Sequence, residues 1–140
     1  MMSASEETTA SDLQSEKALQ AFILQAGGWL ERDELERRIS PEGDAYFVVA
    51  DWLWGLRMFC VEFDGKQFFP PFAFNARWKP LPATRAILDI LWNYSDWHIA
   101  GWFESPNGYL DGTRPRELIA CDRDSVERAA RKYLVGALHA

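Results

Sequence analysis

Residues 102–119 read WFESPNGYLDGTRPRELI, and this stretch predicts an ordered loop that leads into a short helix. Pro, Asn and Gly at positions 106–108 form a turn signal, because Asn and Gly accept positive φ at little cost. A second turn is expected at residues 110–112. Thr113 is the expected N-cap of the helix, and Pro115 stands just inside its start, where a missing N–H costs nothing.

Two longer helices are expected on either side of this stretch. One begins near Thr84, and its apolar face would consist of Ile87, Leu88, Leu91 and Trp92. The other begins near Asp122, and its apolar stripe comprises Val126, Ala129, Ala130, Tyr133, Leu134, Ala137 and Leu138. Because so many apolar positions cannot all be solvated, we expect the stripe to face Trp102 and Phe103. The basic residues of the same helix would then point outward.

The pattern W-x4-N-x2-L-x-G-x2-P-x-E-L-I, followed by the final helix, resembles the antitoxin toxin-binding domain family of the Xre/MbcA/ParS type. The resemblance covers about residues 82–140. The family's L-x-G-x-x-P-x-E-L core falls here on Leu110, Gly112, Pro115, Glu117 and Leu118. Asp111 is a departure, since the family often has a small residue there. The resemblance implies a helical domain that binds and neutralises a cognate bacterial toxin, often a RES-type toxin that consumes NAD.

The same resemblance places the partner-binding element in the C-terminal part of the chain. The residues it implies are Leu110, Gly112, Arg114, Pro115, Arg128, Arg131, Lys132 and His139. A purely structural role is the alternative, and for most of the loop residues it is the stronger interpretation. For the arginines of the final helix, a solvated helix face competes with pairing to carboxylates of a partner.

The first half of the chain predicts three helices. Residues 1–10 are polar, and we expect a disordered tail there. Ser11 is the expected N-cap of the first helix, and the glycines at 27–28 should end it. A short second helix follows and stops before Pro41.

The third helix is expected over residues 44–54. Asp44 can cap it and Gly55 can end it. A strand is the competing interpretation, because Tyr, Phe, Val and Val at positions 46–49 have high β propensity. The presence of a capping residue at the start and a glycine at the end favours the helix.

A β-hairpin is expected next, over residues 58–69, because Asp64-Gly65 is a favoured two-residue turn between apolar runs. Three helices and a hairpin suggest a winged-helix-like lobe over residues 11–76. This lobe also resembles the degenerate helix-turn-helix segment that can precede the toxin-binding domain. Residues 77–140 would form that domain. The expected fold class is therefore mainly α with one β-hairpin.

Composition and charge narrow the possible functions. Seven Trp and nine Phe among 140 residues suggest a core of large rings, or an apolar surface that awaits a partner. Of the 21 acidic and 15 basic residues, residues 1–56 hold 11 and 4, which gives −7, and the remaining 10 and 11 give +1. An acidic first half argues against binding to a phosphate backbone.

The sequence shows no enzyme pattern, and we expect no catalytic residue, cofactor or metal. His98 and His139 have no Cys, His or carboxylate partner at metal-ligand spacing. Cys60 and Cys121 lie far apart, and we expect both to remain reduced and buried. A Cys–His nucleophile pair is the alternative, although nothing in the local sequence supports it.

Two functions from different classes follow. The first is an antitoxin-like module that sequesters a partner toxin, and the second is a transcriptional regulator that binds DNA through the first lobe. We expect DNA binding to be weak, since the third helix, DAYFVVADWLWG, offers no Arg, Lys, Asn or Gln for base edges. Any exposed part of its aromatic face would serve a homo-oligomer.

No apolar run is long enough to span a bilayer and no signal peptide is evident, so a cytoplasmic location is expected.

Overall fold

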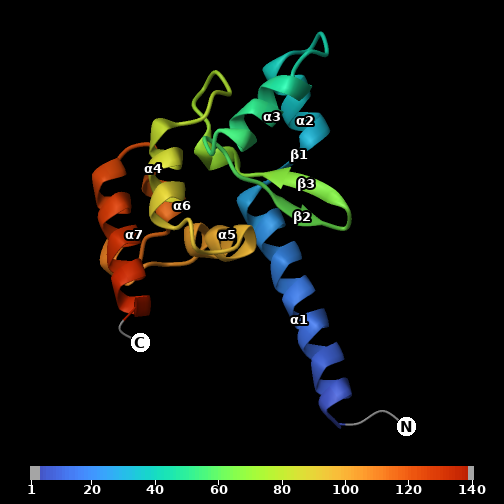
Figure 1. Cartoon of the computed structure of the whole chain (residues 1–140), viewed down its shortest axis with the longest axis vertical. Coiled ribbons are helices and arrows are strands. Elements are labelled where there is room, and N and C mark those ends of the chain that lie inside the picture. Colours follow the sequence, from blue (N-terminus) through green and yellow to red (C-terminus); the bar gives the residue numbers. More distant parts are fainter. Residues whose placement is uncertain (1–3, 139–140) are drawn as a thin grey trace.

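The computed structural model describes the backbone of residues 4–138 and the side chains of residues 10–136, and it is mainly helical with one small antiparallel sheet (Figure 1). The α-helices of the described part are α1 (Ala4–Gly27), α2 (Arg32–Ile39), α3 (Tyr46–Trp54), α4 (Pro82–Ile90), α5 (Asp96–Glu104), α6 (Pro115–Leu118) and α7 (Arg123–Leu138). The strands are β1 (Leu30–Glu31), β2 (Val61–Phe63) and β3 (Lys66–Phe69), and the 3-10 helices are η1 (Pro71–Ala73) and η2 (Gly108–Leu110). The predicted fold class is confirmed.

The hairpin turns where the sequence predicts it. Asp64 and Gly65 have φ of 50° and 74°, the pair of positive values that lets a two-residue turn match the twist of its strands. Pairing begins only at Val61, three residues later than expected. The sheet also holds a strand that the sequence analysis missed, because β1 pairs with β3 and gives the order β1-β3-β2. The first lobe thus has the element order of a winged-helix-like fold.

Helix α1 is longer than predicted. It begins at Ala4, so Ser11 lies inside the helix and the expected cap at Ser11 is wrong. Residues 4–10 were expected within a disordered tail, but they are rich in Ala and Glu, which favour the helical state. Residues 1–3 lie outside the described part. The predicted end is confirmed, because Gly28 has φ of 63° and the Trp29 N–H donates to the Leu24 carbonyl, as in a Schellman motif.

Residues 46–54 form a helix, α3, and not the competing strand. The helix begins two residues after Asp44, and its N-cap, Ala45, makes no side-chain capping bond, so the expected Asp44 cap is wrong. Gly55 ends the helix as predicted, although the positive φ falls on Leu56. Val49 and Trp52 on one side of α3 are buried. The helix forms because this face packs into the first lobe, and not because a side chain caps its N-terminus.

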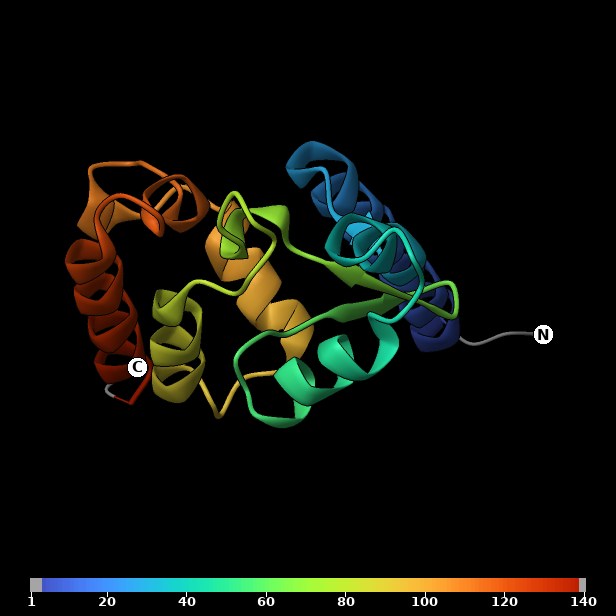
Figure 2. The same cartoon turned by 90° about the horizontal axis from the view of Figure 1, so that it is seen from above.

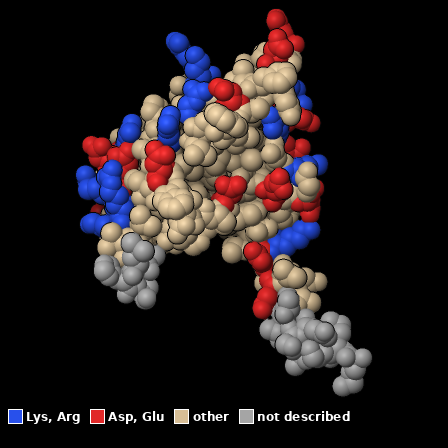
Figure 3. All heavy atoms as spheres, viewed as in Figure 1, with Lys and Arg blue, Asp and Glu red and all other residues tan. Residues whose placement is uncertain are grey.

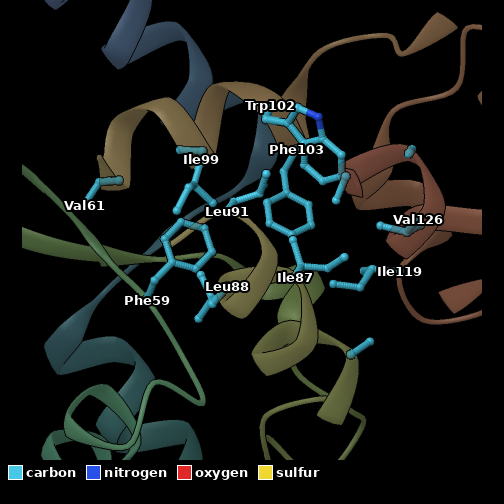
Figure 4. Close-up of a cluster of buried hydrophobic side chains, with 14 of the residues drawn as sticks. Phe59, Val61, Ile87, Leu88, Leu91, Ile99, Trp102, Phe103, Ile119 and Val126 are labelled. Carbon is cyan, nitrogen blue, oxygen red and sulfur yellow. The ribbon is translucent and has the colours of Figure 1, made fainter. Parts of the chain in front are cut away.

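Two buried apolar clusters hold the fold together. The smaller cluster lies within the first lobe and comprises Leu35, Val49, Trp52, Met58, Phe69, Ala73 and Phe74. The larger cluster crosses residue 77, the expected domain boundary, because Leu24, Trp29 and Phe59 join side chains of α4, α5 and α7. Figure 4 shows Phe59 and Val61 beside the buried side chains of α4, α5 and α7. The C-terminal end of α1 and the start of the hairpin therefore share a core with the C-terminal half.

Helices α4 and α7 lie side by side at one edge of the molecule (Figure 2). Helix α4 begins at Pro82, two residues before the predicted Thr84, because Pro is well suited to the first helical position. Trp92 does not belong to its apolar face, since the helix ends at Ile90 and the Trp92 side chain is 74% exposed. Helix α7 buries Val126, Ala129 and Ala130, and these residues pack in the cluster that contains Trp102 and Phe103, as expected.

Candidate protein-binding surface

The loop after α5 is ordered by its own hydrogen bonds. The Asn107 side chain accepts a bond from the Tyr109 N–H at 2.9 Å, and the Asn107 carbonyl accepts from the Gly112 N–H at 2.9 Å. Asp111 and Gly112 have positive φ, 54° and 82°, which turns the chain back toward α6. An Asp tolerates this conformation better than most residues, so Asp111 fits the loop despite its departure from the family pattern.

Helix α6 begins one residue later than predicted. Its N-cap is Arg114 rather than Thr113, because Thr113 donates to the Leu110 carbonyl and accepts from the Asn107 N–H within the preceding turn. The Glu117 carboxylate accepts a bond from the Arg114 N–H at 3.3 Å, which is half of a capping box. An arginine side chain cannot accept the reciprocal bond. Pro115 stands just inside the helix start, as predicted, and is its first residue.

A buried carboxylate ties the loop to α1. The Glu104 side chain is only 5% exposed, and it accepts bonds from the Trp29 indole at 2.9 Å and from the Arg116 guanidinium at 3.1 Å. Arg116 also donates to the Ala26 carbonyl, and Arg114 Nε donates to the Glu104 carbonyl. This cluster, called here the Glu104 clamp, joins the C-terminal end of α1 to both ends of the loop. A carboxylate buried without such partners would be strongly destabilising.

An open groove of about 660 Å³ lies between α1, α5, the loop and α7. Its larger apolar and aromatic side chains are Leu19, Ile23, Trp97, Trp102, Tyr109 and Tyr133. His98 Nε2 and the Tyr133 hydroxyl lie 2.5 Å apart, and Tyr94 stacks on the His98 ring. Burial, and secondarily Tyr94, raises the pKa of Tyr133, so this phenol stays neutral at physiological pH. This wall of the groove is thus formed mainly by aromatic side chains.

A smaller cleft of about 160 Å³ lies on the other side of Tyr109, against α7. Lys132 Nζ lies 5.2 Å from the centre of the Tyr109 ring, and Arg128 donates to the Ser125 hydroxyl at 3.0 Å. Tyr109 lines both the groove and the cleft and is 58% exposed. We call the groove, the cleft and the basic face of α7 together the Tyr109 surface. Figure 3 shows Lys and Arg side chains gathered over α7 at its left edge.

The predicted partner-binding residues fall into three groups. Leu110 and Pro115 are buried, so their side chains shape the loop and do not face a partner. Gly112 supplies a positive φ and Arg114 belongs to the Glu104 clamp, which are also structural roles. The side chains exposed for contact are those of Arg128, Arg131 and Lys132. His139 lies outside the described residues.

The sequence analysis missed Tyr109 and the wall of the groove. Tyr109 follows Gly108 at the tip of a loop, and an aromatic residue at such a position is a signal that could have identified it. Leu19 and Ile23 of α1 line the groove, and Ile23 also packs against the larger cluster. Nothing local in the sequence reveals this, because the groove exists only once the Glu104 clamp positions α1.

Neither cysteine is among the residues that line the groove or the cleft. Cys60 is half-buried, and burial, with a smaller contribution from Asp96, raises the pKa of its thiol to about 11. Cys121 is exposed, contrary to the expectation that both cysteines are buried. The described side chains contain no cluster of three His, Cys, Asp or Glu residues that could hold a metal ion.

Comparison with known proteins finds no protein-family model, curated protein or solved structure that matches this chain. The likeness of residues 82–140 to the antitoxin family therefore stays a prediction from the sequence. Within the described residues, none of the helices combines the length and apolar character needed to cross a membrane.

Proposed function

We propose that this protein is an antitoxin-like binding module that sequesters and neutralises a partner toxin through the Tyr109 surface. The observation that carries the proposal is the position of Tyr109, which joins an aromatic groove to the basic face of α7. An apolar centre with a charged rim is the usual anatomy of a protein–protein interface, and Tyr and Arg are its commonest anchors. The class of partner that the resemblance implies is a toxin of the RES type.

The backbone beneath the Tyr109 surface is held rigidly, which favours binding to a partner. The turn, the short helix and the final helix follow one another in the order that the resemblance implies. Loop hydrogen bonds and the Glu104 clamp fix the backbone around Tyr109, so little conformational entropy would be lost when a partner binds. The residues of the family-like core mostly build this scaffold, and the contacts would come from Tyr109 and α7.

The charge of α7 suggests which part of a toxin it would meet. A toxin that handles a phosphate-bearing cofactor needs a basic pocket, so Arg128 and Arg131 should contact an acidic rim around that pocket. Steering by these charges would speed association and would weaken as salt screens them. The proposed role is binding and inhibition, without catalysis by this chain.

The test uses the product of the adjacent gene as the candidate toxin, co-expressed with the full chain. Tyr109→Ala, and separately Arg128→Glu with Arg131→Glu, should each leave folding intact and weaken toxin binding and growth rescue. Reversal of charge at a desolvated pair typically costs several kcal/mol, which corresponds to at least a hundredfold in affinity. The matched control reverses two exposed charges elsewhere, Arg37→Glu with Arg85→Glu, and should bind like the parent.

Binding that is unchanged in both sets of variants would refute the Tyr109 surface.

A transcriptional regulator is the second candidate function, and the winged-helix-like order of the first lobe favours it. Helix α3 stands where such a fold would place its reading helix, but its exposed side is aromatic and acidic, with Phe47, Asp51 and Trp54. These side chains do not read base edges, so the binding module is the better-supported function.

A further inference from the structure

The outer side of α3 carries an aromatic stripe that nothing in the described chain covers. Phe47, Ala50, Asp51 and Trp54 follow the i, i+3, i+4, i+7 spacing of a single helix face. The Phe47 and Trp54 side chains are 79% and 89% exposed, whereas Val49 and Trp52 on the inner face are buried. The helix lies at an outer edge of the molecule in Figure 2. Two large rings thus stand in solvent at the two ends of one helix.

The exposed apolar area extends beyond this stripe. Tyr46 packs edge-on against Phe47, and Leu56 and Trp92 are also exposed near the other end of α3. Aromatic side chains present about 150–250 Å² each when fully uncovered, so the four aromatic residues and Leu56 together offer on the order of 700 Å². This exceeds the largest apolar patch of a typical monomer, and it is close to the roughly 800 Å² that each partner buries in a standard interface.

A cavity opens beside the C-terminal end of α3. It has a volume of about 430 Å³, and its apolar lining comprises Leu53, Leu56, Met58, Phe59, Leu88, Trp92 and Ile99. The cavity is therefore at one end of the stripe, and the Phe47 ring projects at the other. The two ends are seven residues apart, which is about 10 Å along a helix.

We propose that this face pairs with the same face of a second copy, with the two α3 helices antiparallel. A twofold axis near Ala50 then places Phe47 of each chain beside Trp54 of the other, at the mouth of its cavity. Anchor and cavity occur on the same chain, so the surface is self-complementary, as a twofold interface requires. The small Ala50 side chain lets the two helices approach closely.

Charge does not oppose this arrangement. Asp51 lies near the proposed axis, but Arg57 Nη2 lies 2.9 Å from its carboxylate, so each chain neutralises its own central charge. The exposed stripe carries no Lys or Arg, which disfavours a nucleic acid as the occupant. A second copy fits both the shape and the charge of the face.

The oligomeric state of the full chain tests the proposal. Sedimentation equilibrium between about 1 and 100 μM, a span that brackets a typical weak dimer, should give twice the 16.1 kDa chain mass at the upper end. Phe47→Glu and Trp54→Glu, made singly, should each weaken dimerisation roughly thirtyfold or more, as expected for loss of a buried aromatic anchor. The matched control, Phe22→Glu with Val135→Glu, changes exposed apolar residues outside this face and should still dimerise.

A cross-link tests the position of the axis. In a Cys121→Ser background, Ala50→Cys should form a disulfide-linked dimer on mild oxidation, and Val135→Cys on the distant α7 should not. A parent chain that stays monomeric throughout the concentration range would overturn the proposal, as would a dimer that only the control variant disrupts. The changes at Phe47, Ala50 and Trp54 leave the Tyr109 surface untouched, so failure here is separable from failure of the proposed toxin binding.

Discussion

At the scale of single residues, the Glu104 carboxylate has the largest structural consequence. It lies in a nearly buried site and is satisfied by the Trp29 indole and the Arg116 guanidinium, which come from opposite ends of the chain. Removing one partner of a buried ion pair costs more than the pair contributes, because the remaining charge stays desolvated. The position of α1 against the loop, and hence the groove, therefore depends on these three side chains.

Gly27→Ala should destabilise the protein by about 2 kcal/mol, as overpacking commonly does. A Cβ at residue 27 would overlap Glu104 Oε1 and would lie 2.6 Å from Trp29 Nε1, so the clamp must open to accept it. The measurement is the free energy of unfolding in urea. The control is Gly101→Ala in α5, where nothing lies within 4 Å, and it should stabilise by about 0.5 kcal/mol. Equal effects of the two substitutions would contradict this view of the clamp.

The two thiols should differ in reactivity. Burial raises the pKa of Cys60 to about 11, against a usual 9.0, and a shift of this size lowers the thiolate fraction at pH 8 about a hundredfold. A disulfide reagent should therefore label one thiol quickly and one slowly, and Cys121→Ser should abolish the fast phase. In denaturant both thiols should react quickly. Loss of the fast phase on Cys60→Ser instead would show that the hairpin does not bury this residue.

At the scale of elements, α1 is anchored at one end only. Residues 10–19 are all exposed, and the helix projects beyond the rest of the molecule (Figure 1). Leu24 is its buried side chain, and Lys17 makes an exposed ion pair with Asp64 at 2.6 Å. Surface pairs of this kind contribute little, so the last two turns hold the helix in place.

Deletion of residues 1–14 should change the free energy of unfolding by less than about 0.5 kcal/mol, because the described part of this segment makes no buried contact. Leu24→Ala should cost about 2–4 kcal/mol, since it opens a cavity in the larger cluster. Hydrogen exchange provides a second measurement, with rapid exchange expected over residues 10–19. Strong protection there in the monomer would mean that the helix has a contact along its length.

At the scale of the whole molecule, the charged residues are divided between the two halves, whereas the larger apolar cluster is shared by both. Acidic residues dominate the first lobe, and basic residues are concentrated in the second half, over α7. The larger apolar cluster nevertheless includes residues of both halves, so we expect them to unfold together. The two proposed interaction surfaces, the aromatic face of α3 and the Tyr109 surface, thus share one core.

The isolated protein should not bind duplex DNA with sub-micromolar affinity at about 150 mM salt. Its net charge is −6, and the outer face of α3 offers an aromatic pair and an aspartate where base-reading side chains would be needed. Fluorescence anisotropy with labelled duplexes, including the promoter upstream of its own gene, is the measurement. Tight and sequence-selective binding there would favour the regulator over the binding module.

Local signals in the sequence determined much of this structure. The C-terminal ends of α1 and α3, the hairpin turn and the ordered loop were predicted because Gly, Asn and Asp accept positive φ and Pro fixes its own φ. The apolar stripe of α7 was predicted from its spacing, and its members Val126, Ala129, Ala130 and Tyr133 pack in the cluster of Trp102 and Phe103 as expected. The Ala137 and Leu138 side chains of the stripe lie outside the described part. Where local signals were mistaken, as for the caps at Ser11, Asp44 and Thr113, a neighbouring residue or a packed face fixed the helix end instead.

Only the tertiary structure decided the pairing of β1, the Glu104 clamp, the groove and which face of α3 is exposed. Trp29 and Glu104 are 75 residues apart, and no local pattern states that they meet. Helix α3 has large apolar side chains on both faces, so its sequence is compatible with burying either one. The choice depends on which partners the rest of the chain brings to it, since burial is a property of the assembled elements and not of a single helix.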